Sequence, residues 1–122
     1  DTATILMRTI SGKQISIINS RRATYGYDQR VEVHGSKGSL KVNNPTLSEI
    51  ELAKEAGTNK DRLHHFFMTR YIDAYKNQID YFVDCIKKRS MPKPDGSDGY
   101  YALYLAENAL KSAKTGKTVY LS

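Results

Sequence analysis

The most informative stretch of this 122-residue chain is Ser20-Arg21-Arg22-Ala23-Thr24-Tyr25-Gly26-Tyr27-Asp28-Gln29-Arg30, followed by Val31-Glu32-Val33-His34-Gly35-Ser36-Lys37-Gly38. Its first part crowds two tyrosines, three arginines and a carboxylate into a glycine-hinged break between two apolar runs. A loop that only reverses the chain needs no more than Asn-Gly or Pro-Asp-Gly chemistry. The crowding of hydrogen-bonding groups therefore predicts a loop that holds a polar ligand.

The second part of the stretch predicts a β-hairpin. Val31 and Val33, and then Leu40 and Val42, alternate with polar residues on either side of the turn at residues 35–38. Alternation with period two is typical of a half-buried strand. One face of this hairpin is expected to be apolar and the other polar.

The hairpin pattern extends in both directions. Residues 2–10 and 14–19 are rich in β-forming side chains and flank the turn signal Ser11-Gly12-Lys13. Ile50 and Leu52 alternate with glutamates and indicate a fifth strand. The first half of the chain is therefore expected to be an antiparallel meander.

The second half changes period from strand to helix. Residues 68–88 predict one long helix, because apolar side chains recur at steps of three and four: Tyr71, Ile72, Tyr75, Ile79, Phe82, Val83 and Ile86. Residues 90–96 break this helix, Asp98 is expected to cap a second one, and Gly116 to end it. Residues 118–121 could add a final strand.

These elements predict an α+β domain: an open-faced, mostly antiparallel sheet of about six strands with two helices packed on one face. Two helices cover only one face of such a sheet well. Tyrosine, threonine and isoleucine are frequent in the strands, so we expect a partner on the other face.

Composition bounds the class of protein. The hydrophobic fraction is 39% and the charged fraction 26%, as in an ordinary globular domain. No apolar run is long enough for a bilayer, and no secretory signal is visible, so no membrane partner is expected. The chain begins inside a strand, which predicts a piece of something longer. The single cysteine, Cys85, excludes an intramolecular disulfide and favours a cytoplasmic location.

The net charge of +6 is the one feature that suggests nucleic acid. A nucleic-acid binder usually concentrates its basic side chains in a stripe, interleaved with exposed aromatic rings. Here the lysines are spread along helices and turns, and many of the tyrosines follow helical periodicity. We therefore expect no nucleic-acid partner.

The ordered set of motifs resembles a known family. The matching pieces run through the whole chain in order: Ser20-Arg21, Tyr25-Gly26-Tyr27-Asp28-Gln29-Arg30-Val31-Glu32-Val33, Gly35-Ser36-Lys37-Gly38, Arg70-Tyr71-Ile72-Asp73-Ala74-Tyr75, Asp80-Tyr81-Phe82 and Asp98-Gly99-Tyr100. On these residues the chain resembles the C-terminal domain of the glucose–fructose oxidoreductase/inositol dehydrogenase (Gfo/Idh/MocA) family, closest to its myo-inositol 2-dehydrogenase branch.

The resemblance implies a two-domain enzyme. In the family an N-terminal Rossmann domain binds NAD or NADP, and the C-terminal domain closes over the substrate and builds dimers or tetramers through its open sheet face. It implies that residues 1–122 are the substrate-binding and oligomerisation domain, with a cyclic polyol or sugar, myo-inositol above all, as substrate. The expected partners are the chain's own Rossmann domain and a homodimer or homotetramer.

The sequence also departs from the full family pattern. It has no Gly-x-Gly-x-x-Gly turn to cradle a pyrophosphate, and it lacks the family's catalytic lysine and its Asp/His proton-transfer pair. We therefore expect no cofactor-binding and no catalytic residue in this chain. Alone it is expected to be inactive.

Tyr27 and Tyr75 are the first candidates for substrate contact. The resemblance implies that the hydroxyls of both reach the polyol, and a phenol can donate a hydrogen bond and accept one. The alternative for Tyr27 is packing beneath the loop with its hydroxyl in water. The alternative for Tyr75, four residues after Tyr71, is packing in the helical core.

Tyr25 and Arg70 complete the substrate-binding set. Alternate residues of an extended segment face opposite ways, so Tyr25 is evenly balanced between contact and exposure. Arg70 could hold a polyol oxygen or a carboxylate, or it could pair with a nearby acid.

The remaining polar residues predict no further chemistry. His64 and His65 are adjacent and lack a ligand cluster, so no metal site is expected. Asp28 beside Arg30 predicts a local ion pair or a turn-forming aspartate, and Cys85 a buried thiol. The alternative to a dehydrogenase domain is a non-enzymatic oligomerisation module of a family relative, whose mark would be loss of the tyrosine motifs.

Overall fold

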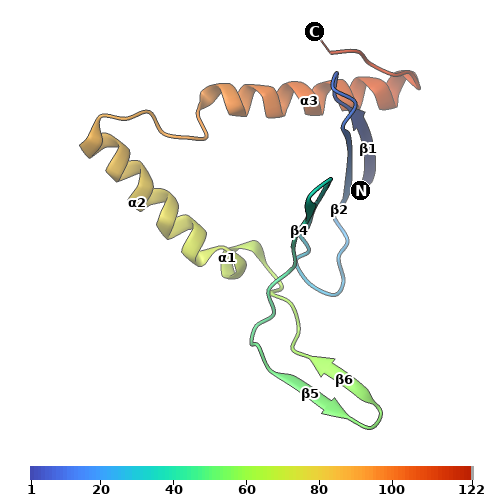
Figure 1. Cartoon of the computed structure of the whole chain (residues 1–122), viewed down its shortest axis with the longest axis vertical. Helices are drawn as coiled ribbons and strands as arrows, with labels where there is room; N and C mark the ends of the chain where they lie inside the picture. Colours follow the sequence, from blue (N-terminus) through green and yellow to red (C-terminus); the bar gives the residue numbers. More distant parts are fainter. Residues whose placement is uncertain (122) are drawn as a thin grey trace. The chain divides into compact units, whose positions relative to one another are not determined.

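The computed structural model describes residues 1–121 as two compact units. The first unit consists of Asp1–Ala3 and Ile18–Tyr75, and the second of Thr4–Ile17 and the chain from Lys76 onward. Among the described residues there are six strands and three helices, and Figure 1 labels all of them except β3.

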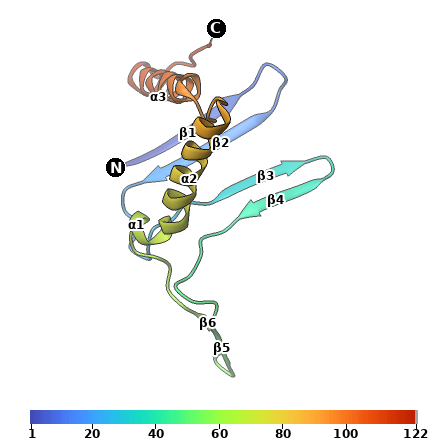
Figure 2. The same cartoon turned by 90° about the vertical axis from the view of Figure 1, so that its left-hand side faces the viewer.

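Strands β1 (Thr2–Arg8) and β2 (Gln14–Ser20) form the first hairpin, drawn side by side in Figure 2. The Thr9 N–H donates to the Lys13 carbonyl at 2.9 Å, and Gly12 adopts a φ of +86° between them. The predicted turn at residues 11–13 is confirmed, because its glycine supplies the left-handed backbone that the reversal requires.

Strands β3 (Val31–Gly35) and β4 (Gly38–Val42) form the second hairpin. Their antiparallel register pairs Val31 with Val42 and Val33 with Leu40, as the alternation predicts. The four apolar side chains therefore share one face. The other face carries the Glu32–Lys41 pair, whose charged groups lie 3.7 Å apart.

Strands β5 (Glu51–Lys54) and β6 (Gly57–Lys60) form a third hairpin. The predicted fifth strand is confirmed, but β6 has no apolar alternation and the sequence does not reveal it. The antiparallel register pairs Glu51 with Lys60, and the carboxylate and ammonium lie 2.5 Å apart.

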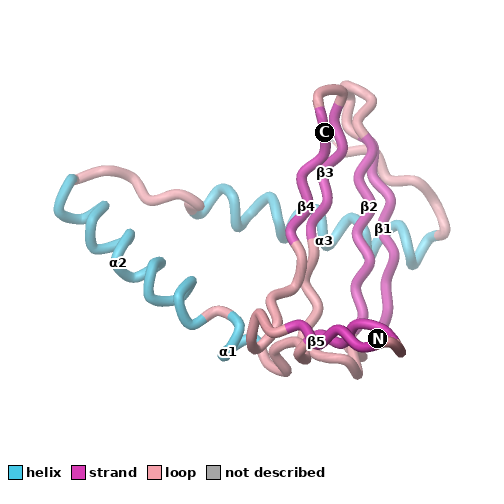
Figure 3. The backbone as a smooth tube through the Cα atoms, turned by 60° about the horizontal axis from the view of Figure 1, so that its bottom comes forward, coloured by secondary structure: helices cyan, strands magenta, loops and turns pink. Residues whose placement is uncertain are grey.

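The expectation of one sheet of about six strands is not confirmed. The described strands form three two-stranded sheets, each a hairpin of neighbours in sequence. Figure 3 draws the strands in magenta. Alternation and turn residues specify pairing within a hairpin. Pairing between hairpins depends on contacts distant in sequence, and those leave no local pattern.

The predicted long helix is two helices. A short helix α1 (Phe67–Arg70) is followed by α2 (Ile72–Lys88), and Tyr71 between them has φ −112° and ψ 23°, outside the helical region. The helical period continues through Tyr71, so the break is invisible in the sequence. On α2 the Cys85 thiol is buried, as expected, with the residue 5% exposed.

Helix α3 (Gly96–Thr115) corrects the predicted N-cap. Asp95, not Asp98, is the N-cap, and its carboxylate accepts from the backbone N–H groups of Ser97 and Asp98. The Asp98 carboxylate in turn accepts from the Asp95 N–H at 2.8 Å, which completes a capping box. Gly116 ends the helix in the left-handed conformation (φ 65°), as predicted. Residues 118–121 form no strand in the described structure.

Asp95→Ala is expected to fray the start of α3. The Lys93 ammonium and the Ser97 hydroxyl and N–H hold the pKa of Asp95 at about 2 in the folded chain, below its unfolded value. Its stabilising effect is therefore complete above pH ~4 and is lost as the pH falls toward 2. At neutral pH the substitution is expected to speed hydrogen exchange at the Ser97 amide roughly fivefold. Thr115→Ala, at the far end of the helix, is the control and should leave that amide unchanged.

None of the helices in residues 1–121 is both long enough and apolar enough to cross a bilayer.

Candidate functional site

The tyrosine-containing loop between β2 and β3 is held against the segment before α1. Gly26 is buried with a φ of +132°, and a Cβ placed there would lie 2.7 Å from the Leu63 Cβ. The next residue, Tyr27, donates its N–H to the His64 carbonyl at 2.8 Å. Glycine lets the loop backbone approach this segment more closely than any side chain would allow.

Asp28 is the electrostatic centre of the loop. One carboxylate oxygen accepts from the Tyr25 hydroxyl at 2.5 Å and from Arg30 Nη2 at 2.8 Å. The other accepts from Arg30 Nε at 2.8 Å and from Asn44 Nδ2 at 2.6 Å. The predicted Asp28–Arg30 pair is confirmed as a bidentate ion pair.

These bonds determine the charge states of the group. Hydrogen bonds from Arg30, Tyr25 and Asn44 hold the pKa of the Asp28 carboxyl far below its usual range. The same carboxylate raises the pKa of the Tyr25 phenol and that of the Arg30 guanidinium. The Asp28 carboxyl is therefore ionised at physiological pH. The Tyr25 phenol stays protonated and donates its hydrogen bond to that carboxylate.

Arg70, at the end of α1, reaches back to the same loop. Its Nη1 donates to Asn44 Oδ1 at 2.7 Å and its Nη2 to the Gln29 carbonyl at 2.9 Å. The guanidinium carbon also lies 5.3 Å from the centre of the Tyr71 ring, within cation–π range. Among the described residues Arg70 pairs with an amide and a carbonyl rather than with an acid.

Tyr27 is half-buried between aromatic rings. Its ring meets that of Tyr71 edge-on with centroids 6.0 Å apart, and that of Phe67 at a tilt with centroids 6.3 Å apart. In residues 1–121 no group hydrogen-bonds to the Tyr27 hydroxyl. The ring is therefore fixed while its polar end keeps its full capacity to donate and accept.

Three of the four predicted site residues come together in this cluster: Tyr25, Tyr27 and Arg70 all contact the loop or its support. Tyr75 lies one turn beyond Tyr71 on α2 and is linked to it by the helical N–H to carbonyl bond of 2.9 Å. Tyr75 is 43% exposed, so it is not a core residue within this structure. Its side chain has no hydrogen bond to a described residue.

The sequence did not single out two residues that the cluster needs, Asn44 and Gln29. The Asn44 amide connects Asp28, the Gln29 N–H and Arg70, and the Gln29 side chain accepts from the Tyr71 hydroxyl. The only local signal at Asn44 is its place in an Asn-Asn-Pro turn. The hydrogen bond between Asn44 and Arg70 joins residues 26 positions apart, and such a contact produces no periodic pattern in the sequence.

The cluster is suited to positioning rather than to acid–base chemistry. Its one carboxylate is fully hydrogen-bonded and ionised, and both guanidinium groups donate within the cluster, although Arg70 Nε has no partner among the described residues. In the described part of the chain no three histidine, cysteine or carboxylate side chains group as a metal site would require. The Tyr27 hydroxyl, which has no partner among the described residues, is a neutral donor and acceptor that matches an alcohol.

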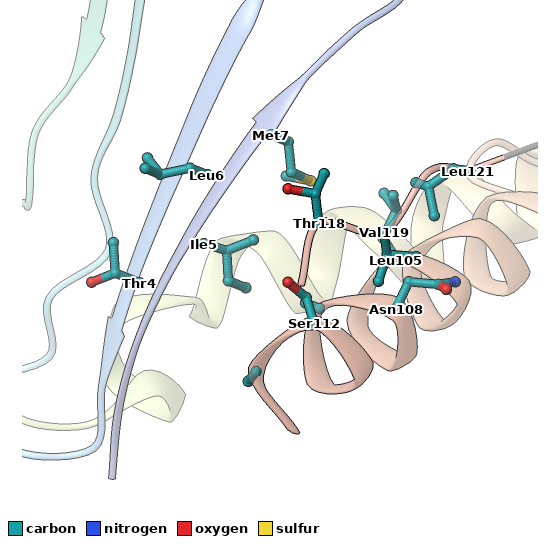
Figure 4. A pocket seen from close by; sticks show the side chains of 12 residues that line it. Thr4, Ile5, Leu6, Met7, Leu105, Asn108, Ser112, Thr118, Val119 and Leu121 are labelled. Atoms are coloured by element: carbon teal, nitrogen blue, oxygen red, sulfur yellow. The ribbon is translucent and has the colours of Figure 1, made fainter. Parts of the chain in front are cut away.

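A cavity lies within the second unit, between β1 and α3 (Figure 4). It has a volume of about 250 Å³ and is lined by side chains such as Ile5, Leu105, Asn108 and Val119. None of its lining residues is charged. It contains no predicted site residue and no group for proton transfer.

Comparison with known proteins gives one consistent result. Residues 1–121 match the oxidoreductase family, C-terminal alpha/beta domain (Gfo/Idh/MocA). The chain is similar to inositol 2-dehydrogenase of Rhizobium meliloti, at 50% identity over 92% of the chain, and to myo-inositol 2-dehydrogenase of Thermotoga maritima, at 40% over 99%.

Solved structures agree with this match. The chain superposes on a myo-inositol dehydrogenase from Corynebacterium glutamicum with a TM-score of 0.93 and 38% identity, covering all of this chain and 37% of that one. It spans about a third of the length of the curated relatives it matches.

Proposed function

Because the chain belongs to the Gfo/Idh/MocA oxidoreductase family, as its C-terminal alpha/beta domain, we propose that it is the substrate-binding and oligomerisation half of an NAD(P)-dependent dehydrogenase. The proposed substrate is a cyclic polyol or sugar, with myo-inositol first. The observation that carries the proposal is the cluster around Tyr27, whose ring is clamped and whose hydroxyl is free for a substrate alcohol. The names of the similar proteins support the choice of inositol.

The residues of this chain do not fit a dinucleotide site, so we place NAD(P) on a Rossmann domain outside residues 1–122. A pyrophosphate binds at a helix N-terminus that follows a glycine-rich turn. At the start of α3 the N–H groups of Ser97 and Asp98 are already taken by the Asp95 carboxylate. NAD(P) supplies the hydride acceptor when bound, and the proton-transfer groups are proposed to lie with it.

In this mechanism the chain's own residues orient the ring. The Tyr27 hydroxyl, with Tyr75 as a second candidate, would hold polyol hydroxyls and so fix the orientation of the substrate ring. Tyr25 and Arg70 contribute through the loop, since the Tyr25 hydroxyl and both terminal nitrogens of Arg70 donate within it or to its support. Correct orientation can lower a barrier by several kcal/mol.

The test is NADH formation with myo-inositol by the full-length protein that contains this chain. Tyr27→Phe is expected to lower kcat/KM for the polyol about tenfold, the value of one lost hydrogen bond in the bound complex, and to leave KM for NAD unchanged. Tyr120→Phe is the matched control, because Tyr120 is 90% exposed and lies in the other unit. Equal effects of the two changes would contradict the role of Tyr27.

We further propose that the full protein is a homodimer or homotetramer in the cytoplasm. The support for assembly is the apolar face of the β3–β4 hairpin, and the support for the compartment is a lone, buried cysteine. A non-enzymatic oligomerisation module is the second candidate. It predicts an assembled protein that forms no NADH with any polyol.

A further inference from the structure

Asp28 has no acceptor capacity left for a ligand. Its two oxygens receive four hydrogen bonds, from Tyr25, from two nitrogens of Arg30 and from Asn44, all between 2.5 and 2.8 Å. The Asp28 side chain is only 15% exposed. A carboxylate so enclosed orders its neighbours and does not act on a substrate.

Asn44 connects the loop to α1 by hydrogen bonds from its side-chain amide. Its Nδ2 donates to Asp28, and its Oδ1 accepts from the Gln29 N–H at 2.8 Å and from Arg70 at 2.7 Å. Arg70 also donates to the Gln29 carbonyl, so both backbone polar groups of Gln29 are held. The amide thus joins two charged groups of opposite sign that the sequence separates by 42 positions.

Tyr27 lies in the sequence between residues whose positions are fixed by packing or by hydrogen bonds. On one side Gly26 is pressed against Leu63, and on the other Asp28 and Gln29 are bonded to Asn44. The Tyr27 N–H is itself bonded to the His64 carbonyl. The Tyr27 hydroxyl has no hydrogen-bond partner among the described residues. A ligand that hydrogen-bonds to this hydroxyl finds the Tyr27 side chain already ordered. Its binding free energy is therefore not reduced by the cost of ordering the loop.

We propose that Asp28 and Asn44 are positioning residues that keep the Tyr25–Arg30 loop in its substrate-competent conformation and thereby present the Tyr27 hydroxyl to a polyol. This inference rests on the proposed function for its substrate. When the competent state is only partly populated, the apparent dissociation constant rises by the inverse of its population. Loss of either residue should therefore raise KM for the polyol more than it lowers kcat.

The experiment uses the full-length protein with Asp28→Asn and Asn44→Asp. Asp28→Asn removes the charge that Arg30 pairs with, and Asn44→Asp replaces the donor to Asp28 with a second negative oxygen. KM for myo-inositol is expected to rise about tenfold or more, with kcat changed less than threefold and KM for NAD unchanged. Asp84→Asn is the matched control, since Asp84 forms an exposed ion pair with Lys88 on α2.

Hydrogen exchange at the Tyr27 amide gives a second readout that does not depend on activity. Exchange should be faster in both variants than in wild type, and saturating myo-inositol should restore the protection. Unchanged exchange, or a KM that stays at the wild-type value in an active enzyme, overturns the positioning role. A wild-type enzyme that is inert toward polyols overturns the proposed function instead, and with it the substrate named here.

Discussion

Gly26→Ala is expected to unfold the tyrosine loop and abolish most polyol oxidation in the full-length protein. The backbone at Gly26 has a φ of +132°, a region that is strained for any L side chain. An added methyl group would also lie 2.7 Å from the Leu63 Cβ and 3.1 Å from the His64 carbonyl. That carbonyl cannot withdraw without losing its bond to the Tyr27 N–H.

Backbone strain and overpacking each cost about 1–3 kcal/mol, so the free energy of unfolding of this unit should fall by about 3 kcal/mol. Urea unfolding and kcat/KM for myo-inositol measure the two effects. Gly57→Ala is a matched control, because Gly57 has a similar φ of +126° but no atom within 4 Å of the added Cβ. If the two variants lose equal stability, close packing against Leu63 is not what requires a glycine at position 26.

The first two hairpins were predictable because each is specified locally, whereas β6 of the third hairpin carries no such pattern. In β3 and β4 the alternation of Val31 and Val33 with Glu32 and His34 sets the faces, and the glycines of the turn set the register. No such rule reaches from one hairpin to the next. The prediction of a single sheet is not confirmed for that reason, although most of the strands were placed correctly.

The helix boundaries show the limit of periodicity. Tyr71 continues the apolar spacing, yet its backbone leaves the helix and its hydroxyl bonds to Gln29. At the start of α3 both Asp95 and Asp98 are good N-cap residues, and only geometry shows that Asp95 is the cap and Asp98 its reciprocal partner. Residue type locates such a boundary to within a few positions.

The candidate site was predictable in its residue types but not in its connections. Tyr25, Tyr27 and Arg70 were recognisable from motifs, and three of the four candidates do surround one loop. The Asn44 bridge was not recognisable, since its partners lie 16 and 26 positions away. A side chain that satisfies long-range partners carries no signature in its immediate sequence.

If the full-length protein assembles as we propose, Leu40→Lys is expected to lower the mass of the assembly, to a monomer where the assembly is a dimer. On β3 and β4 the side chains of Val31, Val33, Leu40 and Val42 share one face and are each 48–60% exposed. Burial of such a side chain contributes about 1.5–3 kcal/mol, and a contiguous exposed apolar face of this kind is typical of an interaction surface. We propose a second copy as the cover, since the same face on both chains is self-complementary across a two-fold axis.

A lysine at position 40 would place an unpaired charge at the centre of that interface. Leaving a buried charge uncompensated costs about 3–5 kcal/mol, which corresponds to a loss of association of roughly a hundredfold to a thousandfold or more. Light scattering behind size exclusion measures the change in mass. Ser39→Lys is the matched control, because it adds the same charge one residue away on the polar face, opposite His34. An unchanged mass together with lower stability in Leu40→Lys would show that the face packs against another part of its own polypeptide.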